Sequence, residues 1–225
     1  MLEIVIIYNN FSFISNIINN VLTNSSIKII GIFNNINESI DFISKHSPDI
    51  IFIPLSDFSA LKNIINSSYH PSIVLLTNTL RSRIFSNILY LSTTTSYSTM
   101  KRTILSFINN KSLQKITLKI EHILCSFNFN LSLNGTKYLI DSIIYSYVHK
   151  NDYVYDNLER KVYTHIAEKY NSNVHNVKWS IVRSINNMYL GNTTSSMKKI
   201  NSYFNLDHLE KPTAKLIIST IVNKI

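Results

Sequence analysis

Cysteine, glycine and long hydrophobic runs are scarce in this sequence, and each shortage excludes a class of protein. Cys125 is the single cysteine, so neither an intramolecular disulfide nor a thiolate metal cluster can form, which suits an intracellular, reducing compartment. No positively charged leader precedes an apolar core, and no apolar run approaches the ~18–20 residues that span a bilayer. The sequence therefore predicts a cytoplasmic protein without a membrane partner.

Signals of catalysis are equally scarce. The three glycines form no glycine-rich phosphate loop, the seven histidines include no HxxxH pair, and neither a nucleophile motif nor paired carboxylates occur. We therefore predict no catalytic residue, no metal site and no cofactor. An enzyme is the least favoured function class.

Positive charge is in excess and is unevenly distributed. The formal net charge is +9, of which residues 1–111 contribute +3 and residues 112–225 contribute +6. Within 157–199 there are seven Lys/Arg against two Asp/Glu. This excess points to a polyanionic partner such as nucleic acid. A solvated, mildly basic helical face would give a similar count.

The first half alternates short apolar runs with segments of helical spacing. The runs that predict strands are Leu2 to Tyr8, Ile27 to Phe33, Asp49 to Ile53, Ser72 to Leu76 and a weaker one near Ile88 to Leu91. Helices are expected at Glu38 to Lys45 and Ser98 to Asn109. This alternation predicts a receiver-like α/β domain, with a five-stranded parallel doubly wound sheet, over residues 1–111.

After residue 111 the pattern becomes helical. The candidate helices are 115–125, 135–149, 156–169, 174–190, 195–203 and 212–224, with no convincing strand among them. The sequence therefore predicts an all-α domain over residues 112–225.

A five-stranded α/β domain followed by a basic all-helical domain resembles a response regulator. The resemblance implies an acidic Mg²⁺-binding pair after the first strand, where this chain has Tyr8 and Asn9. It implies a phosphoacceptor Asp five residues beyond Asp49, where this chain has Pro54. The position of the expected lysine falls near Thr93, and only Thr77 keeps the switch hydroxyl.

Loss of these groups predicts that no phosphotransfer occurs in the first half, because proline has no nucleophilic oxygen. Asp57, three residues on, is a weak candidate substitute. The alternative is another kind of small α/β domain that was never a receiver.

Residues Val162 to Asn186 have the pattern of a helix-turn-helix. A helix with Val162, Ile166 and the small Ala167 ends near Asn171, and a tight turn leads into a second helix. Apolar residues of the second helix recur at spacings of four, four and three, which predicts one buried stripe. The stripe comprises Val177, Ile181, Ile185 and Met188. Two antiparallel helices of an ordinary bundle would look similar.

The other face of the second helix holds the candidate DNA contacts. Arg and Lys side chains suit guanine acceptors or phosphates, and Asn suits adenine. Trp179 either contacts a thymine methyl or sugar edge or packs in the core. The predicted DNA-binding residues are His175, Asn176, Lys178, Trp179, Val182, Arg183 and Asn186, with Lys198 and Lys199 for phosphates.

The second half resembles a known effector domain. The carrying segments are Gly135 to Ile144, Val162 to Asn171, Val177 with Ile181, Gly191-Asn192 and Lys211-Pro212-Thr213. They are similar in order and spacing to the DNA-binding domain of the stage-zero sporulation master response regulator family of endospore-forming bacteria. The resemblance implies six helices that bind DNA as tandem or paired copies. The family's recognition helix is richer in Arg and Glu, so this chain is interpreted as a divergent paralogue.

The sequence thus favours a phosphorylation-independent, sequence-specific regulator of sporulation or stationary-phase genes, with double-stranded DNA as partner. The first half could dimerise constitutively, sense another ligand or protein, or act as a passive scaffold. We favour a homodimer, because pairing raises the local concentration of the second effector domain. The alternative is an interaction module that sequesters a regulator or kinase, as a protein partner, without reading DNA.

Overall fold

The chain forms two compact units, Met1–Ser112 and Leu113–Ile225. The computed structural model describes residues 1–20, 22, 27–65, 70–78, 83–85, 87–150, 157–207 and 210–225. Each unit is described by itself. Within these ranges, no helix has the length and apolar character needed to cross a membrane.

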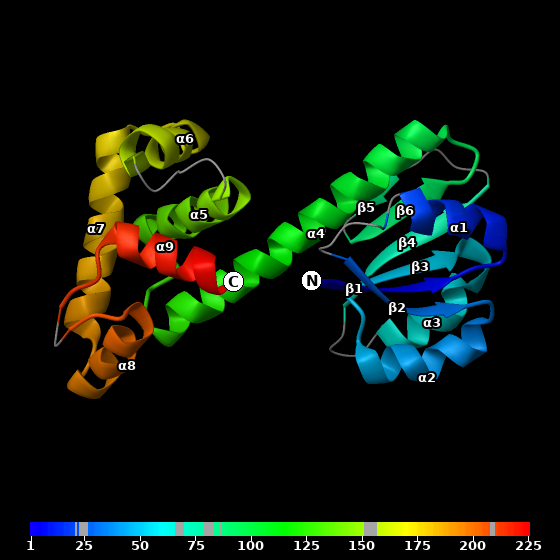
Figure 1. Ribbon diagram of the computed structural model, residues 1–225, viewed down its shortest axis with the longest axis horizontal. Helices are drawn as coiled ribbons and strands as arrows, with labels where there is room; N and C mark the ends of the chain where they lie inside the picture. Colours follow the sequence, from blue (N-terminus) through cyan, green and yellow to red (C-terminus); the bar gives the residue numbers. More distant parts are fainter. Residues whose placement is uncertain are drawn as a thin grey trace. The chain divides into compact units, whose positions relative to one another are not determined.

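The first unit is an α/β domain built on one twisted sheet (Figure 1). Its strands lie in the order β2-β1-β3-β4-β6-β5. Their bounds are β1 Leu2–Ile7, β2 Ile27–Phe33, β3 Ile50–Pro54, β4 Ser72–Thr77, β5 Arg83–Phe85 and β6 Ile88–Ser92. The five strands that the sequence predicts correspond to β1, β2, β3, β4 and β6. They are mutually parallel and lie in the order of a doubly wound fold.

The connection between β4 and β6 differs from the alternating pattern. It contains the short strand β5, which pairs antiparallel with β6 at the edge of the sheet. The sheet therefore has a sixth strand that the sequence did not predict.

Helices cover both faces of this sheet. The helices of the unit are α1 Phe11–Asn20, α2 Ile36–His46, α3 Phe58–Ile65 after the 3₁₀ turn η1 Leu55–Asp57, and the start of α4 Tyr97–Ser126. One core contains Ile14 and Ile17 of α1 with Ile104 of α4, and the other contains Ile43 of α2 with Leu61 of α3. Strand residues alternate between these two cores, so Ile4 and Ile6 face one and Val5 and Ile7 the other.

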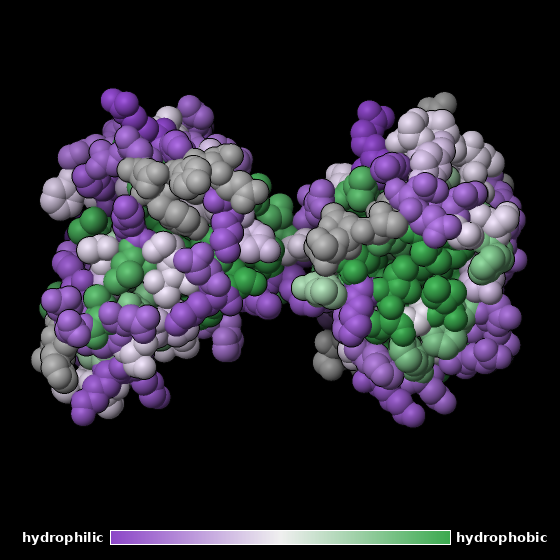
Figure 2. Space-filling view, in the orientation of Figure 1, coloured by the Kyte–Doolittle hydropathy of each residue, from purple (hydrophilic) through white to green (hydrophobic). Residues whose placement is uncertain are grey.

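Strand β2 forms one edge of the sheet and is incompletely covered. Ile32 is 47% exposed, although its neighbours in β1 are buried. Figure 2 shows hydrophobic side chains gathered over the strands of this unit. An apolar edge strand offers backbone groups and side chains to another chain.

Helix α4 corrects the prediction of two separate helices at 98–109 and 115–125. It runs without a break from Tyr97 to Ser126, because Asn109 and Asn110 disfavour a helix only weakly and neither Pro nor Gly interrupts it. Its first half contributes Ile104 and Phe107 to the first unit, and its second half contributes Ile120 to the second.

The second unit is all-helical in its described residues, as predicted. After α4 come α5 Asn134–Val148, the π-helical turn η4 Glu159–Tyr163 leading into α6 Thr164–Lys169, α7 Val174–Gly191, α8 Thr194–Phe204 and α9 Ala214–Lys224. Residue 156, the predicted start of the third candidate helix, lies outside the described residues. One continuous core joins these helices, with Ile120, Ile143, Ile166, Ile181 and Ile218 all buried.

Candidate nucleic-acid interface and the sheet-edge pocket

A tight turn connects α6 to α7 and sets the angle between them. Asn171 takes a left-handed conformation (φ 47°), which Asn tolerates better than most residues. The backbone N–H of Ser172 donates to the carbonyl of Ala167 at 2.8 Å. Asn173 then caps α7, with its Oδ1 accepting from the N–H of Asn176 at 2.8 Å. The predicted helix-turn-helix is therefore present.

Asp141 of α5 fastens the end of α6. Its Oδ2 accepts hydrogen bonds from Lys169 Nζ at 2.6 Å and from the Tyr170 hydroxyl at 2.8 Å. Desolvation, followed by the hydrogen bond to Asp141, raises the pKa of Tyr170 to about 12. The raised pKa keeps the hydroxyl protonated, and so able to donate to Asp141, to a higher pH than in an ordinary tyrosine, and the two hydrogen bonds hold the first helix of the motif on α5.

The buried face of α7 packs closely on α5. It carries the predicted stripe and one hydroxyl, namely Val177, Ile181, Ser184, Ile185 and Met188. Ser184 and Thr136 of α5 share a buried hydrogen bond at 2.6 Å. A Cβ at Gly135 would lie 1.9 Å from the Ser180 carbonyl oxygen, so only glycine permits this approach. The packing on α5 determines which face of α7 remains exposed.

The opposite face of α7 carries several of the residues that the sequence predicts to bind DNA. Trp179 is 59% exposed, so of the two possibilities left by the sequence it does not pack in the core. Arg183 is exposed, while Val182 and Asn186 are half-buried. Together with Ser180 these residues line a shallow hollow of about 370 Å³. The hollow combines an aromatic ring, a guanidinium and an amide at successive turns of one helix.

The first turn of α7 places the other predicted contacts. His175 and Asn176 are exposed, and the His175 ring meets the Trp179 ring edge-on at 5.9 Å. Lys178 is exposed as well, but its ammonium forms an ion pair with Glu159 of η4. A carboxylate thus lies beside the basic surface, and it offsets part of the charge that Lys178 brings.

Lys198 and Lys199 lie on α8 rather than on α7. Both are exposed, in the second turn of α8, which begins at Thr194 and is capped by Thr193. They therefore belong to a separate helix from the candidate DNA contacts of α7, within the helix predicted at 195–203.

Folding brings one further residue to the exposed face of α7, and the sequence analysis did not predict it. Lys211 is exposed in the segment before α9, and its Nζ donates to Asn186 Oδ1 at 2.8 Å. Twenty-five residues separate the two side chains in the sequence. No local pattern connects them, although Lys211 belongs to the segment Lys211-Pro212-Thr213, one of those that resemble the effector domain.

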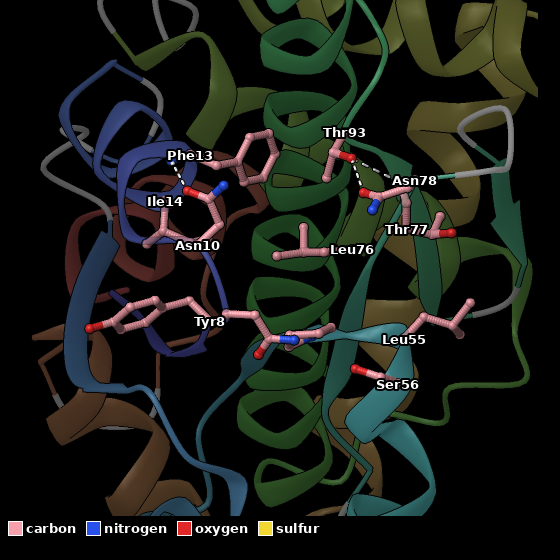
Figure 3. Close-up of a pocket in the computed structure, with 12 residues that line it drawn as sticks. Tyr8, Asn10, Phe13, Ile14, Leu55, Ser56, Leu76, Thr77, Asn78 and Thr93 are labelled. Atoms are coloured by element: carbon pink, nitrogen blue, oxygen red, sulfur yellow. Dashed lines mark hydrogen bonds between the residues drawn. The ribbon is translucent and has the colours of Figure 1, made fainter.

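The first unit has a pocket of about 580 Å³ at the carboxyl ends of β1, β3 and β4 (Figure 3). Such an edge is where doubly wound domains bind ligands. The lining includes all five positions at which a receiver would have its functional groups. It comprises Tyr8, Asn9, Asn10, Phe13, Ile14, Pro54, Leu55, Ser56, Leu76, Thr77, Asn78 and Thr93.

Among the residues that the structure describes, the lining of this pocket carries no carboxylate and no cationic side chain. Pro54 is buried as the last residue of β3 and offers no oxygen nucleophile from its side chain. The Thr93 hydroxyl, at the lysine position, donates to Asn78 Oδ1 at 2.5 Å and approaches the Thr77 carbonyl at 3.3 Å (Figure 3). The described lining therefore offers neither the acid pair that Mg²⁺ prefers nor an amine that would pair with a phosphoryl group.

The nearby aspartates do not supply the missing groups. Asp57 ends η1, accepts from the Ser56 hydroxyl at 3.0 Å and is absent from the pocket lining. Asp49 precedes β3, and its Oδ2 accepts from the Glu3 N–H at 2.9 Å. Both carboxylates thus lie outside the pocket.

Comparison with known families concerns the second unit. Residues 120–225 match the family model described as Sporulation initiation factor Spo0A C terminal. The resemblance inferred from the sequence is thereby confirmed for this part of the chain, and the first unit lies outside the match. That family is a DNA-binding effector domain. No curated protein matches the chain.

Proposed function

We propose that this protein is a sequence-specific regulator of sporulation or stationary-phase genes that reads duplex DNA with α7 and needs no phosphorylation. The observation that carries the proposal is the exposed face of α7, where Trp179, Arg183 and Asn186 follow one another at spacings of four and three. Residues so spaced lie on one side of a helix and reach into the same groove.

The chemistry of that face suits the edges of base pairs. A guanidinium makes two hydrogen bonds to the O6 and N7 acceptors of guanine, and an aromatic ring contacts thymine methyl groups. The effector-domain match over residues 120–225 supports duplex DNA as the partner. Exposed Lys198 and Lys199 suit phosphate contacts that position the helix without selecting a sequence.

Independence from phosphorylation is supported by the first unit. Pro54 stands where a receiver would have its phosphoacceptor, and the described residues that line the pocket around it include neither metal-binding acids nor a lysine. In this proposal the first unit acts by pairing two chains, which brings two effector domains onto adjacent half-sites. The partly exposed strand β2 supports this role.

Selection from random duplexes by the purified, untreated chain tests the proposal. We expect a defined motif and an affinity that falls with salt, since each neutralised phosphate contributes a slope of about −0.9 in log–log form. Arg183→Ala should weaken binding to the selected site about 5- to 150-fold, the range of one base contact. Arg102→Ala, on the exposed surface of α4, removes the same charge elsewhere and should leave the motif unchanged.

A phosphoryl donor provides the second arm. Acetyl phosphate with Mg²⁺ should change neither the intact mass of the chain nor its DNA affinity. A folded chain that enriches no motif would make the protein-interaction alternative the leading one. Phosphorylation that increases DNA binding would contradict the phosphorylation-independent mechanism alone.

A further inference from the structure

The contact between Lys211 and Asn186 determines which way the Asn186 amide points. Nζ lies 2.8 Å from Oδ1, so the amide oxygen accepts from the ammonium. The reverse orientation would set the amide NH₂ against the ammonium, donor against donor. Charge-assisted hydrogen bonds are about twice as strong as neutral ones, so this contact is a firm constraint. The Nδ2 group consequently points away from Lys211 as a donor for a ligand, while the second lone pair of Oδ1 lies beside a positive charge.

Lys211 is well placed to hold this position. The next residue, Pro212, is buried, and Thr213 caps α9 by accepting from the Leu216 N–H at 3.2 Å. The backbone beside Lys211 is thus anchored at the start of a helix whose core-facing residues are fully buried. Asn186 is carried by the rigid α7, one turn after Arg183.

The constraint changes what this end of α7 can recognise. Asparagine reads adenine with two groups, because Oδ1 accepts from N6 while Nδ2 donates to N7. Here Oδ1 already accepts from Lys211 on one lone pair, and an adenine amino group that approached the other would lie beside the ammonium, which repels its positively polarised N–H. The groups that this contact brings beside Oδ1 are donors: Asn186 Nδ2, the other N–H groups of Lys211 and, one turn away, the Arg183 guanidinium.

We propose that Lys211 is a specificity-determining residue that makes Asn186 select guanine rather than adenine. Guanine offers two acceptors, O6 and N7, in the major groove, which matches a row of donors. This inference rests on the proposed reading of DNA by α7. It assigns a role in base choice to a residue outside the helix-turn-helix.

The test compares the base preferences of four full-length proteins by selection from random duplexes. Asn186→Ala identifies the position that Asn186 reads, as the one whose preference it flattens. At that position the wild type should favour guanine over adenine by about tenfold or more. Lys211→Met, which keeps the side-chain length without its donors, should reduce that ratio about tenfold. Lys215→Met removes an exposed lysine of α9 and should leave the ratio unchanged.

The outcomes separate this inference from the function on which it rests. A wild-type motif with adenine at the identified position overturns the inference, as does a Lys211→Met protein that keeps the guanine preference and only weakens all sites equally. Failure of Asn186→Ala to flatten any position also overturns it. A folded wild type without any motif would instead remove the proposed function itself. If Lys211→Met unfolds, Lys211→Gln gives the same comparison with an uncharged side chain.

Discussion

Tyr163 is almost completely buried at the end of η4, where the helix-turn-helix begins. Its side chain is 4% exposed, and desolvation, followed by the charge of Glu159, raises its pKa to about 12 from an ordinary value of 10. The folded protein therefore keeps the phenol proton at a pH where the unfolded chain has lost it. The contribution of the neutral phenol to the free energy of unfolding is therefore fully present below pH 10, and it is lost as the pH rises towards 12.

We expect the free energy of unfolding to fall by about 2–3 kcal/mol between pH 10 and pH 12 through this group alone. The Tyr163→Phe protein has no phenol to ionise at this position, so its free energy of unfolding should fall by about 2–3 kcal/mol less over the same pH interval. Urea unfolding of both proteins at several pH values measures the difference. Tyr170, whose pKa is also raised, is present in both proteins and cancels from the comparison. Equal losses in the two proteins would contradict the assignment.

Single residues were predictable where their chemistry is local. Pro54 excludes an acyl phosphate whatever surrounds it, and the exposed side of α7 followed from the spacing of its apolar stripe. The exposure of Trp179 was not predictable, because the packing of α7 on α5 decides it. The orientation of Asn186 depends on Lys211, which no local pattern connects to it.

At the scale of elements, the contact of α5 with α7 positions the reading helix. The two helices approach so closely at Gly135 that a methyl group there would overlap the Ser180 carbonyl, next to the buried Thr136–Ser184 hydrogen bond. The small side chains on both helices make this approach possible. Any change in their separation would move Arg183, which lies on the turn after Ser180.

Gly135→Ala should therefore destabilise the second unit by about 1–3 kcal/mol, the usual cost of overpacking. Gly191→Ala is the matched control, since nothing lies within 4 Å of its added Cβ. At the last position of α7, it should be neutral or stabilising by up to about 1 kcal/mol. Urea unfolding followed by circular dichroism gives both values. A Gly135→Ala protein as stable as the control would show that the helices move apart without cost.

Elements were predictable where one period dominates a segment. Five strands, predicted from short continuous apolar runs, and the helix-turn-helix, predicted from helical spacing, lie where they were expected. The unbroken α4 was missed because weak helix breakers at residues 109–112 looked like a boundary, while packing on both units stabilises the helix through them. Strand β5 was missed because three residues carry almost no periodic signal, and pairing with β6 defines it.

The whole molecule consists of two units, each with its own hydrophobic core. The core of the second unit draws only on residues from Ile116 onward, and the cores of the first end at Ile108. DNA reading and the proposed pairing are therefore assigned to separate units. Strand β2, with Ile32 47% exposed at the edge, is the surface we assign to pairing.

We expect a fragment of residues 113–225 to select the same motif as the full chain, because the reading helix and its supports lie within it. On duplexes with two half-sites the full chain should bind about a hundredfold or more tightly than the fragment, and on one half-site the two should be similar. Ile32→Lys, which places a charge on the edge strand, should abolish the advantage. Fluorescence anisotropy with the one-half-site and two-half-site duplexes measures the affinities of the full chain, the variant and the fragment. An advantage that survives Ile32→Lys would assign pairing to another surface.

The sequence by itself determined the α/β and all-α classes of the two units, the proline at position 54 and the presence of a helix-turn-helix. These properties follow from residue chemistry, from short continuous apolar runs and from the helical period of 3.6, all of which are local. Only the tertiary structure decided that α4 is continuous, that β5 joins the sheet and that Lys211 reaches Asn186. Each of these depends on contacts between residues that are distant in the chain or on packing that outweighs weak local preferences.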